Sequence, residues 1–423
     1  MRGGILARMG QRDDTFELEL TGMAHGGAAI GRREGRTIFA PYAIPGERVR
    51  ARIVEDKGRF ARAQVIEVLS PSPDRVEPPC PHFGPGQCGG CHWQHIAYPA
   101  QLRLKREVMI DQLRRVGRID DPPVQATLPS PDPWAYRVHA TFQVDAHGAL
   151  GFWSDDNRRI VPVETCLIIR EELLDLLGEL AFEPGSLNRA RLQVGSDGAL
   201  LMTLSADDDQ PPELETDLPI SVNFLLSDNE PFNLIGSTHT RYEVRGRWFR
   251  ATGGSFFQAN LPVAGLLIDE VLRRLDLDGD ESVLDLYSGV GLFSAFLAER
   301  AALVTAVESY PPAVTDAEFN LAEFDNVDLI EGAVEDALPD LEGPYAAAVL
   351  DPPRTGMTPG AVDALAAHAP RTIVYVSCDP ATLARDARRL LGRGYTLVDV
   401  QPVDMFPQTF HIESVSRFVR AQV

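Results

Sequence analysis

Residues 283–294, VLDLYSGVGLFS, decide the fold of this chain. An apolar strand pattern runs directly into Gly289 and Gly291, and an apolar helix pattern follows. Glycines at such a turn let the backbone approach a ligand closely. About twenty residues further on, the next strand pattern ends in Glu308, where a carboxylate can accept hydrogen bonds from ribose hydroxyls. The segment has neither the third glycine of a dinucleotide fingerprint nor a P-loop pattern, which favours S-adenosylmethionine over NAD or ATP as the ligand.

Strand and helix patterns alternate on both sides of this turn, from Phe256 to the C-terminus. The predicted helices cover 260–275, 292–300, 311–324, 359–368 and 380–392, and the predicted strands cover 282–288, 303–309, 327–332, 346–351, 371–377, 395–403 and 414–420. This order predicts an α/β domain with a parallel doubly wound sheet, whose last strand forms an antiparallel edge.

Chemically useful side chains follow two of these strands. The element Asp351-Pro352-Pro353-Arg354 ends the fourth strand, and its prolines restrict the backbone so that Asp351 faces the ligand crevice. Cys378 ends the next strand, and we expect the helix that follows to stabilise its thiolate. Glu413 lies just before the final strand, two residues after His411. The sequence therefore predicts a thiol and two carboxyl groups at one crevice.

The N-terminal half has a different organisation. Residues 1–14 are predicted to be a short disordered leader, with Met9 as an alternative start, and residues 15–69 carry β-like runs that fit a five-stranded barrel. The proline-rich link 71–79 marks a boundary. The predicted domains are 12–70, 71–245 and 246–423, and the predicted central strands are 139–145, 148–153, 159–163, 191–195 and 198–206. An amphipathic helix over 101–118 has a basic face that is either solvated, in contact with RNA or packed on the C-terminal domain.

Composition limits the class of protein. The 423 residues include no stretch of about 20 apolar residues and no secretory signal, so we expect a cytoplasmic protein without a membrane span. We also expect a monomer. The net charge is −21, distributed as +3 over residues 1–69, +1 over 70–125 and −25 over 126–423. A nucleic-acid partner would therefore have to bind local basic patches rather than the surface as a whole.

Five motifs together resemble a known family. They are FFQAN (256–260), DLYSGVG (285–291), DPPR (351–354), SCDPAT (377–382) and FPQTFHIESV (406–415). In this order they resemble the RNA uracil-5 methyltransferases, and the N-terminal barrel resembles the OB-like, RNA-binding TRAM domain of that family. The resemblance implies a Rossmann-like class I methyltransferase domain behind a TRAM barrel and a central β-rich iron–sulfur domain.

The resemblance also assigns roles to individual residues. It makes Cys378 the nucleophile and Glu413 the base, whereas Gln258, Tyr287, Glu308 and Asp351 would hold S-adenosylmethionine or the target base. This pair suits methylation of carbon 5 of uracil, because a thiolate must add to carbon 6 and a base must then remove the carbon-5 proton. Two positions depart from the family pattern. Phe410 replaces a smaller residue, and Leu292 stands where some members have a polar cofactor contact.

The remaining four cysteines form a separate set, Cys80, Cys88, Cys91 and Cys166. A reducing compartment argues against disulfides, and four thiolates suit either a tetrahedral zinc ion or an iron–sulfur cluster. Members of the family that act on ribosomal RNA carry a four-iron cluster on similarly spaced cysteines, so the resemblance favours [4Fe–4S] in a structural role. It also favours ribosomal RNA, and 23S rRNA in particular, over transfer RNA as the substrate.

Two other function classes compete with this interpretation. RNA cytosine-5 methyltransferases use the same thiolate addition but usually place the cysteine in a T-C-S element or after a D-x-P strand, whereas here Arg354 follows Pro353. A non-catalytic RNA-binding protein could keep the fold, but it would have no need for both Cys378 and Glu413. A radical enzyme is disfavoured because all four clustered cysteines would be ligands.

Overall fold

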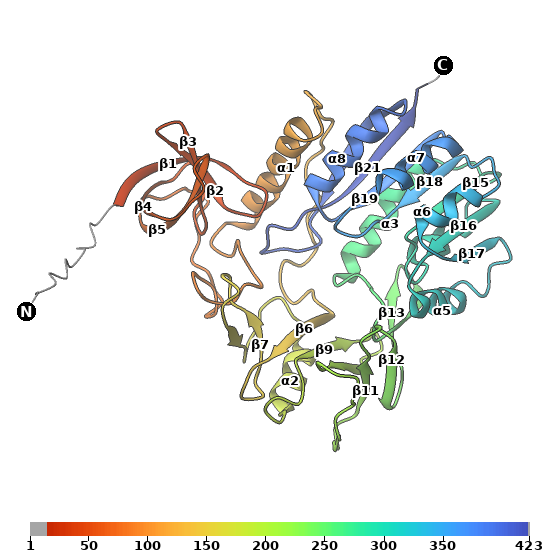
Figure 1. The fold of residues 1–423 in the computed structure, drawn as a ribbon, viewed down its shortest axis with the longest axis horizontal. Helices are drawn as coiled ribbons and strands as arrows, with labels where there is room; N and C mark the ends of the chain where they lie inside the picture. The colour runs from red at the N-terminus through yellow and green to blue at the C-terminus, as the bar shows by residue number, and fades with distance from the viewer. Residues whose placement is uncertain (1–14, 422–423) are drawn as a thin grey trace, which may run out of the picture.

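A computed structural model describes residues 15–421, so the leader predicted at 1–14 lies outside the described residues. Figure 1 shows three parts: a barrel in red, a central sheet in yellow to green, and an α/β domain in green to blue. Among residues 15–421 no helix is both long and apolar enough to cross a bilayer.

The N-terminal part is the predicted five-stranded barrel. Its strands close in the order β1-β2-β3-β5-β4. They are β1 (Thr15–Met23), β2 (Ala29–Arg33), β3 (Arg36–Ala40), β4 (Arg48–Asp56) and β5 (Phe60–Ser70). Alternate side chains point inward along each strand, as Leu18 and Leu20 do in β1. The barrel therefore has a small apolar core of its own.

The central part is a seven-stranded sheet in the order β12-β11-β10-β9-β6-β7-β8. Its elements are β6 (His139–Val144), β7 (Leu150–Trp153), β8 (Ile160–Pro162), α2 (Glu171–Glu179), β9 (Arg189–Val194), β10 (Leu200–Ser205), β11 (Ile220–Leu225) and β12 (Pro231–Ile235). A separate ribbon pairs β13 (His239–Val244) with β14 (Arg247–Thr252) through a tight turn at Arg245 and Gly246. The five predicted strands are present, but the sequence analysis missed β11 to β14 and α2.

The C-terminal part is the predicted doubly wound domain, with sheet order β17-β16-β15-β18-β19-β21-β20. Its strands are β15 (Ser282–Leu286), β16 (Leu303–Glu308), β17 (Val327–Glu331), β18 (Ala347–Leu350), β19 (Thr372–Ser377), β20 (Tyr395–Val403) and β21 (Glu413–Arg420). One detail of the prediction is wrong. The last strand, β21, is antiparallel but inserts between β19 and β20. β20 is the edge strand, and it therefore exposes Thr396 and Val398, whereas most of β21 is buried.

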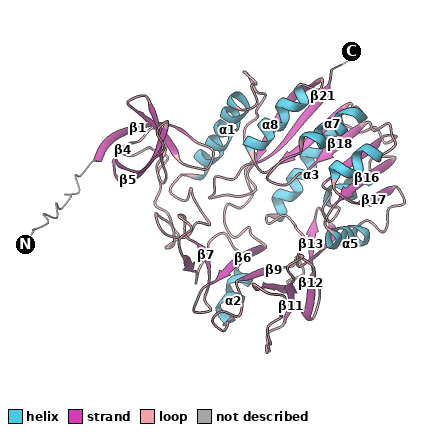
Figure 2. Ribbon diagram, viewed as in Figure 1, coloured by secondary structure: helices cyan, strands magenta, loops and turns pink. Residues whose placement is uncertain are grey.

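Helices cover both faces of this sheet (Figure 2). One face carries α3 (Leu261–Leu275), α4 (Leu292–Ala298) and α5 (Pro311–Asn320), and the other carries α6 (Val334–Ala337), α7 (Pro359–His368) and α8 (Pro380–Leu391). Successive strand residues serve opposite faces, as Val283 and Leu284 do in β15. Continuous apolar runs such as residues 373–376 follow from this two-sided burial. The helix predicted at 101–118 is α1 (Tyr98–Arg115), which packs against α8 rather than lying free on the surface.

Candidate active site

Two adjacent strands bring the candidate nucleophile and base together. Cys378 follows β19 directly, and Glu413 begins β21. The two strands pair in antiparallel register through Ser377 and Ser414, so Cys378 and Glu413 are neighbours across the ladder. Cys378 is partly exposed to the crevice, whereas Glu413 is only 4% exposed. Asp351 follows β18, the next strand in the sheet.

The crevice collects acidic groups. Burial, followed by the charges of Glu413 and Asp351, raises the pKa of the Cys378 thiol to about 12. Burial and Asp351 also raise the pKa of Glu413 well above its usual range, and the Arg354 guanidinium opposes this shift only in part. Burial and Asp285 raise the pKa of Asp351 to about 7. Both the thiol and Glu413 therefore favour their protonated forms more strongly than free side chains do.

The structure does not show the expected stabilisation of the Cys378 thiolate by the following helix. The free N–H groups at the start of α8, those of Ala381 and Thr382, donate to Oδ1 of Asp379 at 2.8 and 2.9 Å. Asp379 thus takes the donors that the thiolate would have used, and its own charge adds to the repulsion around Cys378.

The carboxyl group of Asp351, which is partly exposed, leads to a prediction about stability and pH. Its pKa is about 7 in the folded protein against an ordinary 3.8, so folding favours the protonated form and stability falls as pH rises from about 4 to 7. We expect Asp351→Asn to stabilise the protein by about 1–3 kcal/mol at pH 8 and to have no such effect near pH 3.5. Thermal unfolding of both proteins across this range is the measurement. An equal effect at both pH values would contradict the assignment.

The glycine turn and the end of β16 form a second polar cluster. Gly289 has a positive φ of 56°, and its N–H donates to Oε2 of Glu308 at 2.9 Å. The other oxygen of Glu308 accepts from the N–H groups of Ser309 and Tyr310, each at 2.8 Å. Within residues 15–421, Oδ1 of the fully buried Asp285 has no hydrogen-bond partner. Unsatisfied buried polar atoms beside a glycine turn fit a site that a polar ligand completes.

Two other residues were predicted to hold the cofactor: Tyr287 lies beside this turn, and Gln258 lies before α3. Tyr287 directly follows β15 with a positive φ of 64°, and its ring packs against the apolar cluster around α7 and α8. Gln258 is only 6% exposed and lies in the loop between β14 and α3. That loop is joined to the central part of the chain, because the N–H of Val138 donates to the carbonyl of Ala259 at 3.0 Å.

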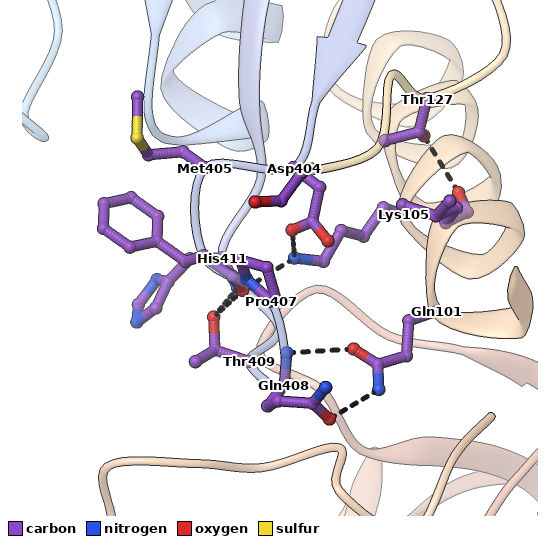
Figure 3. Close-up of polar contacts among 12 residues, drawn as sticks. Gln101, Lys105, Thr127, Asp404, Met405, Pro407, Gln408, Thr409 and His411 are labelled. Atoms are coloured by element: carbon purple, nitrogen blue, oxygen red, sulfur yellow. Dashed lines mark hydrogen bonds and ion pairs between the residues drawn. The ribbon is translucent and has the colours of Figure 1, made fainter. Parts of the chain in front are cut away.

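The segment before Glu413 is held by α1 (Figure 3). Packing of this helix on the C-terminal domain was one of the predicted alternatives, but its polar partners were not predicted. Lys105 Nζ donates to Oδ1 of Asp404 at 2.5 Å and to the carbonyl of Phe406 at 3.0 Å. Gln101 and Gln408 exchange two hydrogen bonds of 2.9 and 3.0 Å. Gln101 and Lys105 lie four residues apart on the buried side of α1, and this spacing on an apolar face was the available signal.

The buried pair Lys105–Asp404 predicts a large stability effect. Both side chains have no exposed surface, so Lys105→Met leaves an uncompensated carboxylate in the interior. We expect the variant to lose about 3–5 kcal/mol of stability, measured by denaturant unfolding. Lys105→Met combined with Asp404→Leu should recover most of this loss, whereas Lys57→Met, at an exposed ion pair, should change little. A single variant as stable as the wild type would contradict the prediction.

The two departures from the family pattern have different surroundings. The ring of Phe410 lies 4.3 Å from that of His92, and a side chain at Gly27 of the barrel would meet the Cβ of Phe410 at 2.8 Å. Phe410 therefore fits because residue 27 is a glycine. Leu292 is buried in the apolar cluster that contains α3 and α4.

The other four cysteines line a different cavity, of about 450 Å³, between residues 80–91 and the segment at Cys166. Burial raises the pKa of Cys88 to about 11 and that of Cys91 to about 12, and neighbouring thiols add to both shifts. Among the residues that the structure describes, no three His, Cys, Asp or Glu side chains converge closely enough to hold a metal ion. The predicted iron–sulfur character of the central domain is thus not shown by the structure, and the four thiols do not form a ready zinc site.

Comparison with known proteins gives two family matches. Residues 11–66 match the TRAM domain, and residues 341–420 match the tRNA (Uracil-5-)-methyltransferase family. The second matched segment contains Asp351, Cys378 and Glu413. A solved structure with a similar fold is the Pyrococcus abyssi tRNA (uracil-54, C5)-methyltransferase in complex with S-adenosyl-L-homocysteine. It has a TM-score of 0.73 and 24% identity and covers 96% of this chain and 100% of that chain.

Relatives along the whole chain are named as RNA methyltransferases. One from Halalkalibacterium halodurans is 35% identical and covers 96% of this chain and 97% of its own length. One from Streptomyces coelicolor is 36% identical and covers 95% of this chain and 92% of its own length. With its TRAM barrel and its uracil-5 methyltransferase segment, the chain belongs to the RNA uracil-5 methyltransferase family and is an RNA uracil methyltransferase.

Proposed function

We propose that this enzyme transfers a methyl group from S-adenosylmethionine to carbon 5 of a uridine in RNA, through a covalent bond between Cys378 and carbon 6. The observation that carries the proposal is the placement of Cys378 opposite Glu413 across the β19–β21 ladder, with Asp351 at the end of the neighbouring strand. A thiol and a carboxyl group at one crevice are the two groups that this reaction needs.

The bonds balance in four steps. Cys378 gives its proton to water and its sulfur adds to carbon 6, which moves an electron pair into the uracil enolate. Carbon 5 of the enolate would then accept the methyl group of S-adenosylmethionine, whose sulfonium–methyl bond breaks and leaves S-adenosylhomocysteine. Ionised Glu413 removes the remaining carbon-5 proton, and the electron pair of that C–H bond restores the double bond as sulfur leaves carbon 6. Because burial raises the pKa of Glu413, it opposes the ionisation that the proton-removal step requires.

The residues around the glycine turn fit the proposed cofactor. Glu308 would accept hydrogen bonds from ribose hydroxyls. Because Gly289 has no side chain, a nucleoside could come close to the backbone there. Gln258, Tyr287 and Asp351 would hold the rest of the cofactor or the uracil beside it. When bound, S-adenosylmethionine supplies the methyl group and a positive sulfonium that favours ionised neighbours.

A mechanism-based trap tests the reaction. RNA that carries 5-fluorouridine at the target should form a stable covalent complex with the protein when S-adenosylmethionine is present, because fluorine cannot leave as a cation. RNA with 5-fluorocytidine at the same position should form none, which separates uracil from cytosine chemistry. A protein without methyl transfer, as in a non-catalytic RNA-binding role, would trap neither. Trapping by 5-fluorocytidine alone would reassign the substrate.

For the RNA target we propose 23S rRNA, because a TRAM barrel together with four clustered cysteines resembles the ribosomal enzymes. A second candidate is transfer RNA, favoured by the name of the matched family segment and by the Pyrococcus abyssi fold relative. Mapping of 5-methyluridine in ribosomal and transfer RNA from a deletion strain distinguishes the two. We also infer that the enzyme acts as a cytoplasmic monomer and that the barrel binds single-stranded RNA.

For Cys80, Cys88, Cys91 and Cys166 we propose a structural [4Fe–4S] cluster. Four thiols that line one cavity are a complete ligand set for it, and a cubane holds its thiolates further apart than a single zinc ion does. We expect anaerobically purified protein to be brown, to absorb broadly near about 400 nm and to contain about four iron and four sulfide per chain. Cys166→Ser should lower the iron content and leave the alkylation rate of Cys378 unchanged. Stoichiometric zinc without iron or sulfide would overturn the proposal.

A further inference from the structure

The barrel reaches the candidate nucleophile through the loop between β1 and β2, residues 24–28. Nε2 of His25 lies 3.3 Å from Oδ2 of Asp379, the residue that follows Cys378. The loop is closely packed where it meets the rest of the protein. The carbonyl of Gly27 accepts a hydrogen bond of 3.1 Å from the buried indole of Trp93, and the α-carbon of Gly27 has no room for a side chain. The position of His25 is therefore a built feature of the interface.

Asp379 connects three parts of the protein. Its Oδ1 caps α8, its backbone N–H donates to Oγ of Ser377 at 3.2 Å, and its Oδ2 faces His25. Although burial opposes ionisation, His25 and the backbone donors of α8 hold the pKa of Asp379 at about 2, so it stays charged. One carboxylate thus joins the end of the nucleophile's strand, the following helix and the barrel.

The charge on Asp379 also acts on the thiol. The ionisable groups that face Cys378 are Glu413, Asp351, Asp379 and Arg354, three acids and one guanidinium. A carboxylate next to a thiol disfavours the thiolate, and a hydrogen-bond donor on that carboxylate weakens the effect. His25 is placed to supply such a donor from outside the methyltransferase domain.

We propose that His25 is a positioning residue for Cys378: it holds Asp379 in its capping geometry and offsets the negative charge beside the nucleophile. The inference rests on the proposed role of Cys378 and extends it, since it makes the barrel part of the catalytic apparatus as well as an RNA-binding module. Loss of the imidazole should raise the thiol's pKa and leave RNA affinity in place.

The test compares full-length His25→Ala, His25→Gln and wild type. The first measurement is the alkylation rate of Cys378 by iodoacetamide at pH 8 without RNA, followed by mass spectrometry of the Cys378 peptide. The second is kcat and KM for RNA methylation. We expect His25→Ala to lower both the alkylation rate and kcat about tenfold, because one pKa unit changes the thiolate fraction by that factor, and to leave KM within about twofold. The glutamine amide can donate to Asp379, so His25→Gln should recover most of both rates.

His147→Gln, in the exposed β6–β7 hairpin, is the matched control and should change neither rate. Unchanged alkylation in His25→Ala, a loss confined to KM, or no recovery with glutamine would overturn the inference. The alkylation measurement needs no turnover, so it separates two failures. An active Cys378→Ala enzyme would refute the proposed function, whereas normal alkylation in His25→Ala would refute only the role of His25.

Discussion

Cys378→Ala should abolish methylation and any covalent protein–RNA complex while leaving cofactor binding intact. The proposed reaction starts with addition of the Cys378 sulfur to carbon 6, and the uracil ring alone is a poor nucleophile at carbon 5. We expect the rate to fall by at least about four orders of magnitude, as for other removed nucleophiles. The measurement is transfer of labelled methyl groups to RNA, together with a denaturing gel for the complex. The residue lies at a partly exposed strand end, so the substitution removes little packing.

Controls separate chemistry from binding in this variant. Affinity for S-adenosylhomocysteine should match wild type, because Glu308 and the turn at Gly289 are unchanged. They follow β16 and β15, which β18 separates from the strand of Cys378. Ser377→Ala, one residue earlier on β19, should retain turnover far above that of Cys378→Ala. An adduct or product formed by Cys378→Ala would require another nucleophile.

The doubly wound domain could be predicted because its signals are local. Residues 373–376 are fully buried, so most of strand β19 appears in the sequence as an apolar run. The strand ends that carry Asp351 and Cys378 follow from the same pattern. The order of the last two strands could not be predicted in this way, because both are apolar and only pairing across the sheet distinguishes the edge from the interior.

Features that depend on distant partners were the ones that local patterns could not reveal. Lys105 belongs to a helix with a basic face, and its partner Asp404 is 299 residues away. Phe410 was treated as a departure from the family pattern, and only the folded protein pairs it with Gly27 of the barrel. The contact between His25 and Asp379 is of the same kind.

The electrostatics of the crevice were also beyond local reasoning. A cysteine before a helix predicts a stabilised thiolate, but the sequence does not say how deeply the neighbouring acids are buried. The pKa of Cys378 rises because the thiol is largely buried and because Glu413 and Asp351 lie near it, and Asp379 has already bound the helix donors. Both proposed reacting groups therefore favour their protonated forms, and alkylation of Cys378 in the free protein should be slow at neutral pH.

Glu413 serves the last step of the proposed reaction, so its loss should have a different signature from the loss of Cys378. Glutamine keeps the size of the side chain but cannot accept the carbon-5 proton, and sulfur cannot leave carbon 6 while that proton remains. Glu413→Gln should therefore reduce turnover by about 10²- to 10⁴-fold and accumulate a methylated covalent complex. The complex would appear as a slow band on a denaturing gel, carrying label from the methyl donor.

Three comparisons make the result specific. Cys378→Ala combined with Glu413→Gln should form no complex, and Glu331→Gln, at the exposed end of β17, should turn over like wild type. Because the pKa of Glu413 is raised by burial, the wild-type rate should increase with pH as Glu413 and the thiol ionise, until both are deprotonated in the substrate complex. In Glu413→Gln, the rate at which the covalent complex decays should no longer rise with ionisation of residue 413, because glutamine has no carboxyl group. Normal turnover of Glu413→Gln would assign proton removal to another group, and Asp351, another carboxyl group beside Cys378, would be the next candidate.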